Sequence, residues 1–299
     1  MLERLHLSIL REVERKGTLT EAAESLNLTQ SALSHSIKKL ENHFGVRLWE
    51  KDGRRLRFTE AGRYVAAAAA RLIPQFDHAE RILEQFAAGQ RGIIRIGIEC
   101  HPCYHWLTGV ISPFLKEWPG VDVDIRQEYR FGGMGALIGH DIDLLITPDP
   151  LKMTGLVFEP VLDYEMVLVV PKDHSLAGAE RAFPHELTGD VLLTYPVEDG
   201  RLDIMNQFFV PARCRPRKHK HVENTEILLQ MTAAGRGVTA LPKWLVDEYA
   251  AAYGIRGLRL GAHGVFKQLF VGRRKSDRLE EYVAGFIAMA RKAGGTTDG

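Results

Sequence analysis

The sequence has few cysteines, no long apolar run and almost no net charge, and each lack excludes a class of protein. Three cysteines in 299 residues are too few for a secreted scaffold held by disulfides. No run approaches the ~18 apolar residues of a membrane span. The first residues, MLERLHLSILREVERKG, alternate charged with apolar positions, which is unlike a signal peptide. We therefore expect a protein of the reducing cytoplasm, without a membrane partner.

The overall charge does not by itself indicate a nucleic-acid partner. Lys and Arg number 39 against 38 Asp and Glu, which leaves a formal net charge of +1. Any contact with phosphate must therefore come from the local placement of cations. The length suits two or three compact domains.

The stretch 17–44, GTLTEAAESLNLTQSALSHSIKKLENHF, predicts two helices joined by a tight corner. Thr18 and Glu21 have the capping-box spacing at the start of the first helix. Thr29 can cap the second helix, and Gly45 suits the left-handed residue that ends it. Small alanines in the first helix let the second lie close across it. This pattern is a helix-turn-helix, whose second helix enters the major groove of DNA.

Polar side chains follow one face of the second helix, and a basic hairpin at 49–58 predicts a wing around an Asp-Gly turn. Gln30 and His35 are the predicted base-reading residues, because both can bond base edges in the major groove. The remaining polar residues are the predicted phosphate anchors. The alternative, a solvated polar surface, is the weaker interpretation inside this motif. The predicted DNA-binding residues are Thr29, Gln30, Ser31, Ser34, His35, Lys38, Arg54, Arg55 and Arg57.

A long helix is predicted at 60–87, where an apolar stripe recurs with nearly heptad spacing. At ~1.5 Å per residue this helix would be about 42 Å long, more than one small domain covers. The simplest partner is the same helix of a second copy, which would give a symmetric dimer. Pro74 is expected to kink this helix or to end its first part. The stripe comprises Val65, Ala69, Leu72, Ile73, Phe76, Ala79, Ile82, Leu83 and Phe86.

From residue 93 the pattern changes to strands alternating with helices, which predicts an α/β domain with helices covering parallel sheets. Two sheets of four or five strands would form a two-lobed clamp, with lobe I at 91–162 and 265–299 and lobe II at 163–264. The predicted domains are therefore 1–58, 59–90 and 91–299. Expected strands are 93–98, 121–126, 144–147, 157–162, 166–170, 192–195, 219–222, 238–241 and 266–273; expected helices are 104–118, 134–139, 202–209, 226–234, 243–253 and 278–293.

The motif A-A-E-S-L-N-L-T-Q-S-A-L-S-H-S-I-K-K-L-E-N-H-F-G-V-R-L-W, followed by R-F-T-E-A-G, resembles the winged helix-turn-helix of LysR-type transcriptional regulators. Ser31 stands where proline is usual in that family, and His35 where arginine is usual. The motifs I-E-C-H-x-C-x-x-W-L-T, L-L-x-Y-P-V-x-x-x-R-L-D and A-L-P-x-W are similar to the methionine-biosynthesis regulators within it. The resemblance implies a periplasmic-binding-protein-like effector domain and a homodimer or homotetramer on double-stranded DNA. It also implies an activator role involving RNA polymerase, and homocysteine as the small-molecule effector, with no other cofactor.

The resemblance also implies which loops line the effector cleft. A small amino acid there needs donors for its carboxylate, which the amides starting helix 102–118 could supply. Its ammonium needs an acceptor such as Glu99 or Asp149, and its thiol end needs a soft or apolar wall. The predicted effector-binding residues are Glu99, Cys100, His101, Trp106, Thr108, Phe131, Thr147, Asp149, Tyr195, Thr225 and Pro242.

Cys100, His101, Cys103 and His105 also allow other interpretations. Soft ligands at close spacing suit zinc, but structural sites usually divide their ligands between two segments, so no metal site is expected. A redox pair of Cys100 with Cys103 is a second alternative. The favoured interpretation is that these are small residues that line the cleft.

Other functions would share only part of this pattern or would not be distinguished by it. A regulator of another small-acid or sulfur-metabolite pathway would share every motif above. A solute-binding protein shares the clamp but would have no helix-turn-helix. An enzyme is not expected, because no nucleophile, base and orienting group can be placed together by spacing.

Overall fold

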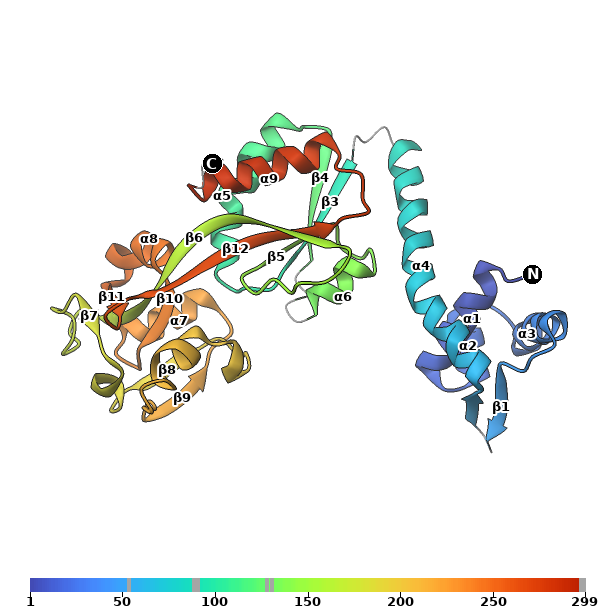
Figure 1. Cartoon of the computed structure of the whole chain (residues 1–299), viewed down its shortest axis with the longest axis horizontal. Coiled ribbons are helices and arrows are strands. Elements are labelled where there is room, and N and C mark those ends of the chain that lie inside the picture. Colours follow the sequence, from blue (N-terminus) through green and yellow to red (C-terminus); the bar gives the residue numbers. More distant parts are fainter. Residues whose placement is uncertain (53–54, 88–91, 127–128, 130–131, 296–299) are drawn as a thin grey trace. The chain divides into compact units, whose positions relative to one another are not determined.

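The computed structural model describes residues 1–52, 55–87, 92–126, 129 and 132–295 (Figure 1). The chain divides into an N-terminal unit, residues 1–92 with 138–141, and a C-terminal unit, residues 93–137 and 142–299. None of the described helices is both long enough and apolar enough to cross a membrane.

The N-terminal unit contains the predicted helix-turn-helix, and its capping is as expected. The Thr18 hydroxyl accepts from the Glu21 amide at 3.3 Å, and the Thr29 hydroxyl accepts from the Ala32 amide at 3.2 Å. Gly45 ends the second helix with φ 67°, in the left-handed region. The elements are α1 (Arg4–Lys16), α2 (Leu19–Ser25), α3 (Gln30–Phe44), β1 (Trp49–Asp52), β2 (Arg55–Phe58) and α4 (Glu60–Ala87).

A residue with positive φ forms the tight corner between α2 and α3, and small buried side chains let these helices pack closely. Asn27 takes a positive φ of 54°, which asparagine tolerates better than bulky residues do. Ala22 is fully buried, so α3 can pack close with Leu33 and Ile37, which are also fully buried. Each such aliphatic side chain contributes about 1.5–3 kcal/mol when buried. This packing turns the polar face of α3 outward.

The wing is an antiparallel pair in which Trp49 lies opposite Phe58. The turn at 53–54 lies outside the described residues. The buried Glu41 carboxylate of α3 accepts from the Leu48 amide at 2.7 Å, which ties α3 to the entry of the wing. Helix and wing therefore form one rigid unit.

Helix α4 is continuous over 28 residues and contains Pro74, so of the two expectations for that proline the end of the helix is wrong, while the kink stays a prediction. Contacts on both sides of the proline hold the helix. Leu7 of α1 packs with Ala69 and Ile73, and Arg4 of α1 pairs with Asp77 at 2.5 Å. Helix α1 of the same chain covers part of the apolar stripe, and the pairing of the rest with a second copy stays a prediction. Other stripe residues are exposed: Leu72, Phe76 and Leu83.

Replacing Gly62 with alanine is expected to destabilise the N-terminal unit by about 1–3 kcal/mol or more. An added Cβ would lie 1.8 Å from the Leu48 carbonyl oxygen, a backbone atom that cannot move aside without shifting the wing. Gly109 in helix α5 (Cys103–Glu117) is the matched control, because a Cβ there meets nothing within 4 Å. Thermal unfolding of both variants tests this, and equal melting temperatures would contradict the packing described.

The C-terminal unit alternates strands and helices as predicted, and its fold class is the expected α/β. Its strands are β3 (Gly92–Ile98), β4 (Val121–Arg126), β5 (Leu144–Thr147), β6 (Leu156–Pro171), β7 (Arg181–Ala182), β8 (Val191–Thr194), β9 (Lys218–His221), β10 (Thr239–Pro242), β11 (Ile255–Leu260) and β12 (Val265–Arg274). Its α-helices are α5 (Cys103–Glu117), α6 (Gly133–Ile138), α7 (Thr225–Ala233), α8 (Lys243–Tyr253) and α9 (Glu281–Ala293).

One continuous sheet connects the two lobes, whereas two separate sheets were predicted. Within the described residues the order is β4-β3-β5-β12-β6-β11-β7, with β10 also paired to β6. The predicted strands 157–162 and 166–170 are one 16-residue strand, β6, which pairs along its length with β12. Figure 1 shows these two strands running together through both lobes. The pairing shifts register at Leu269 and Phe270, an irregularity of the kind that bends a sheet without breaking it.

The lobes have separate apolar cores beside this shared pair of strands. In lobe I, α5 and α9 pack together through Phe114 and Phe286. In lobe II, α7 and α8 pack on one side of the sheet, while β8 and β9 form a parallel pair of their own. Strand β11 was not predicted, and the expected helix at 202–209 is a π-type helix at Ile204–Phe209. The last helix begins at Glu281, later than predicted.

Candidate functional site

The outward face of α3 carries the predicted DNA-contacting side chains. Gln30, Ser31, His35 and Lys38 are exposed, and Ser34 is half-buried. They lie opposite the stripe that is buried in the core. Four polar groups with both donors and acceptors thus stand on one face of a helix, as major-groove readout requires.

The remaining predicted DNA contacts lie at the start of α3 and on the wing. The Thr29 and Ser31 hydroxyls lie 3.1 Å apart at the first turn. Arg57 is exposed, and its guanidinium is 3.8 Å from the Glu50 carboxylate, a loose surface pair that leaves it available to phosphate. Arg54 and the side chain of Arg55 lie outside the described residues.

A pocket of about 110 Å³ opens between the lobes of the C-terminal unit. The ends of β3 and β5 supply its lobe I wall, where the carboxyl ends of strands carry ligand sites in α/β sheets. Lobe II closes it with the segment after β8 and with β10. The lining residues are Glu99, Cys100, His101, Pro102, Pro148, Asp149, Tyr164, Met166, Thr194, Tyr195, Val197, Arg201, Leu202, Asp203, Ile204, Thr239, Ala240, Leu241 and Pro242.

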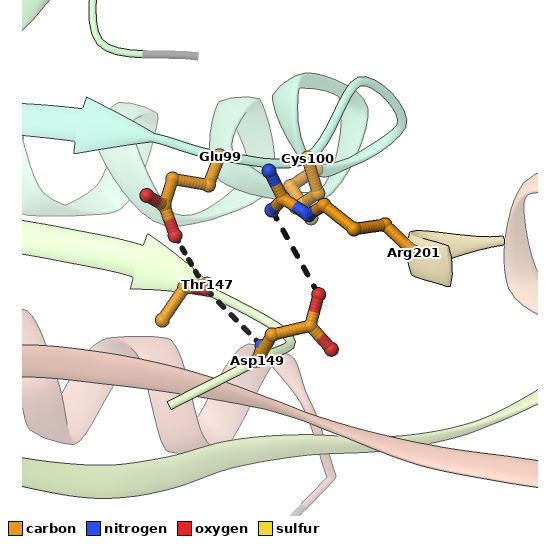
Figure 2. The surroundings of a disulfide bond; sticks show 6 residues. Glu99, Cys100, Thr147, Asp149 and Arg201 are labelled. Carbon is orange, nitrogen blue, oxygen red and sulfur yellow. Dashed lines mark hydrogen bonds and ion pairs between the residues drawn. A yellow bond between two sulfur atoms is a disulfide. The ribbon is translucent and has the colours of Figure 1, made fainter. Parts of the chain in front are cut away.

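The Glu99 carboxylate is engaged within lobe I. One oxygen accepts from the Thr147 hydroxyl at 2.8 Å, and the other accepts from the Gly133 amide at 3.0 Å. The Thr147 hydroxyl oxygen in turn accepts from the Asp149 amide at 3.2 Å (Figure 2). Thr147 is fully buried and lies behind the pocket wall rather than in it. This chain of bonds fixes the loop after β5.

Charged groups of both lobes meet at the other side of the pocket. Lys267 Nζ of β12 lies 2.8 Å from Asp149 Oδ1 and 3.2 Å from Asp203 Oδ2. The Arg201 guanidinium lies 3.8 Å from the Asp149 carboxylate. The Asp149 side chain is 42% exposed, so it can still accept from a ligand. The site therefore offers a carboxylate for an ammonium group and cations for an anion.

Aromatic side chains close the pocket across the lobes. The His101 ring of lobe I stacks on the Tyr195 ring of lobe II, with centroids 4.3 Å apart. The Tyr195 hydroxyl lies 2.9 Å from the buried Thr225 hydroxyl. Burial raises the pKa of Tyr195, and it raises the pKa of Tyr164 together with the nearby charges of Asp203 and Asp149. Both phenols therefore stay neutral and can donate.

Cys100 and Cys103 form a disulfide, so the favoured prediction of two unbonded cleft residues is wrong. Cys100 follows the end of β3 and Cys103 begins α5, and the turn between them brings their Cα atoms to 5.5 Å, an ordinary disulfide separation. Cys100 lines the pocket, whereas Cys103 is only 4% exposed and belongs to the lobe I core. Zinc binding needs thiolates, and these sulfurs are bonded to each other.

Four predicted effector contacts do not line the pocket, and one lies outside the described residues. Trp106 is buried in the lobe I core, and the exposed Thr108 donates to the His105 carbonyl within α5. Thr147 and Thr225 are buried behind the pocket wall, where they hydrogen-bond to pocket residues. Phe131 is outside the described residues.

Sequence reasoning missed Arg201, Asp203, Thr239 and Lys267. The motif R-L-D at 201–203 was noticed but not assigned a role. Lys267 and Thr239 lie within strands and carry no sequence pattern that separates them from other strand residues.

Comparisons with known proteins agree with both units. The family described as "Bacterial regulatory helix-turn-helix protein, lysR family" matches residues 5–63, and "LysR substrate binding domain" matches residues 87–295. The transcriptional regulator MetR of Escherichia coli K12 is 37% identical over 97% of this chain and 90% of that protein. The regulatory domain of MetR from N. meningitidis is 32% identical, with a TM-score of 0.62 over 68% of this chain and 94% of that domain.

A more distant likeness covers the whole fold. CbnR complexed with its target DNA is 20% identical, with a TM-score of 0.65 over 98% of this chain and 100% of that one. At that identity the likeness concerns the fold alone. Because the substrate-binding family covers most of the chain and the relatives match nearly its full length, the chain belongs to the LysR family of bacterial helix-turn-helix transcriptional regulators and is not an enzyme.

Proposed function

We propose that the chain controls methionine-biosynthesis genes in the cytoplasm and responds to homocysteine. The pocket supports this proposal. One small cavity is lined by the partly exposed Asp149 carboxylate, the cationic Arg201 side chain and Cys100, which contributes a sulfur atom. These are the groups that a small sulfur-containing amino acid needs. The near full-length likeness to relatives named MetR supports the same assignment.

DNA recognition is assigned to α3, presented by a homodimer or homotetramer. Leu72, Phe76 and Leu83 of the α4 stripe are exposed, although apolar helix faces normally find a partner. The same helix of a second copy would cover this face and would place two α3 helices on two half-sites. Contact with RNA polymerase would then convert DNA binding into activation.

We propose one orientation of homocysteine in the pocket. Its ammonium would lie at Asp149. Its carboxylate would take the open amides at the start of α5, where Pro102 occupies the N-cap and has no side-chain acceptor for them. Its sulfur would then face Cys100. A related small acid without sulfur would use the same amides and carboxylate, and it is the second candidate.

Replacing Asp149 with alanine is expected to weaken homocysteine binding at least about 10-fold, because a charge-assisted hydrogen bond contributes about 1.5–3 kcal/mol. Lys267 keeps Asp203 as a partner, so the fold should survive the change. Asp122→Ala is the matched control, since Asp122 is exposed on β4 and does not line the pocket. Thermal shift of the full chain against homocysteine, homoserine and methionine measures this. Equal stabilisation by all three, or by none, would remove homocysteine as the effector.

A further inference from the structure

The disulfide lies where a bound ligand would meet it. Cys100 forms part of the pocket wall, and it follows Glu99, whose carboxylate is held by Thr147 and Gly133. Figure 2 shows the Arg201 side chain of lobe II, whose guanidinium pairs with the Asp149 carboxylate. One sulfur of the bond therefore belongs to the pocket wall, and the cationic Arg201 side chain lines the same cavity. The other sulfur is buried.

We propose that the pocket binds a low-molecular-weight thiol covalently, by thiol–disulfide exchange at Cys100. The inference rests on the proposed function for the choice of homocysteine as the probe. The class of ligand follows from the site itself, because a disulfide is an electrophile that reacts with thiolates and with few other metabolites.

The exchange is balanced and needs no outside oxidant. The ligand thiol loses its proton to solvent, and its sulfur attacks Cys100 Sγ. A bond forms between the ligand sulfur and Cys100, the bond from Cys100 to Cys103 breaks, and its electron pair leaves on Cys103 Sγ. Attack of Cys103 on the mixed disulfide reverses each step and releases the thiol. The ligand is thus held and returned without being consumed.

The positions of the two sulfurs set the direction of attack. Cys100 is partly exposed and Cys103 is 4% exposed, so a ligand in the pocket reaches Cys100 first. Cys103 is the first residue of the 15-residue helix α5, whose free amides and dipole stabilise a departing thiolate. The exposure of Cys100 and the stabilised thiolate of Cys103 therefore both favour attack at Cys100.

A second feature points to a ligand in the same pocket. Thr239 lines the cavity and is only 1% exposed, and its hydroxyl has no hydrogen-bond partner in the part of the chain that the structure describes. A buried hydroxyl without a partner costs free energy, so a polar ligand group is expected to satisfy it. Thr239 belongs to lobe II, opposite the disulfide, which lets one ligand contact both lobes.

The exchange would also change the structure around it. The disulfide ties the end of β3 to the first turn of α5, and opening it frees that turn. His101 lies within the closed loop and stacks on Tyr195 of lobe II. Exchange at Cys100 is therefore coupled to a contact that holds the lobes together.

The test is peptide mass spectrometry on the oxidised full chain carrying Cys214→Ser, which removes the free cysteine. The chain is incubated with homocysteine, quenched with iodoacetamide and digested. The expected result is homocysteine in disulfide linkage to Cys100 and an alkylated Cys103. Mercaptoethanol at equal thiolate concentration is expected to react at least about 10-fold more slowly, because it gains nothing from the pocket's polar groups. An intact disulfide, or equal rates with both thiols, would overturn the proposal.

Two further variants separate this inference from the proposed function. Thr239→Val is expected to slow exchange with homocysteine several-fold and to leave exchange with mercaptoethanol unchanged. In the Cys100→Ser/Cys103→Ser chain, an undiminished effect of homocysteine on DNA retention would keep the effector assignment and overturn covalent binding. Adduct formation without any effect on DNA retention would establish covalent binding and overturn homocysteine as the effector.

Discussion

Replacing Asp143 with alanine is expected to lower the free energy of unfolding of the C-terminal unit by about 3–5 kcal/mol, because it leaves buried cations without their shared carboxylate. Asp143 lies 2.7 Å from the Arg95 guanidinium and 3.3 Å from the Arg274 guanidinium. Arg95 and Arg274 are 5% and 4% exposed. The three residues belong to β3, β12 and the start of β5, so the carboxylate holds three neighbouring strands of lobe I together.

Urea unfolding of the full chain measures this loss, and Asp124→Ala is its control. Asp124 also pairs with an arginine, Arg126, at 2.7 Å, but both side chains are about two-fifths exposed. Exposed pairs contribute about 0–1 kcal/mol. If both variants lose equal stability, the buried ion pairs of Asp143 do not contribute more to the free energy of unfolding than an exposed pair does.

Replacing both Gln30 and His35 with alanine is expected to abolish specific DNA binding. Each base contact of this kind contributes about 1–3 kcal/mol, or roughly 5- to 150-fold in affinity. Both side chains are exposed on α3 and lie outside the apolar core, so the fold should be unaffected. Fluorescence anisotropy on a duplex selected in vitro by the full chain measures the change, with a scrambled duplex for comparison.

Lys38→Ala is the informative control, because Lys38 is predicted to contact phosphate and not a base. Its affinity should fall on both duplexes alike, and the slope of log affinity against log salt should decrease by about 1. Loss of specificity in this variant, together with retained specificity in the double variant, would reverse the roles given to these residues.

The N-terminal unit was predictable because its signals are local. Caps at Thr18 and Thr29, the glycine at 45 and the alternation of buried with polar positions all act within a few residues. The contact of α1 with the α4 stripe was not predictable in this way, because it is distant in sequence. The stripe of α4 was visible in the sequence, but the apolar face of α1 packs on part of it. That contact joins Leu7 to Ala69 and Ile73, more than sixty positions later.

The C-terminal unit shows the same division between local and distant signals. Strands with apolar runs were located, whereas β11, with sequence I-R-G-L-R-L, has charges and a glycine that mask it. Whether β6 is one strand or two depends on β12, more than a hundred residues later, which pairs across the expected break. The pocket loop around Cys100 was found by resemblance. Thr239 becomes a pocket residue, and Lys267 a partner of the pocket carboxylate of Asp149, only when distant strands are paired. The pairing of Cys100 with Cys103 was an alternative that no sequence pattern supported, whereas the turn between them brings their Cα atoms to 5.5 Å.

The most direct test of the account is dimethyl sulfate protection of the selected duplex by the full chain, because guanine N7 lies in the major groove. If α3 reads DNA from a symmetric assembly, protected guanines should fall in two groups whose centres lie about 10–10.5 base pairs apart, or a multiple of that. The Gln30→Ala/His35→Ala chain should lose both groups together. Protection that survives this double change, or that never reaches the major groove, would contradict the placement of α3 in the DNA.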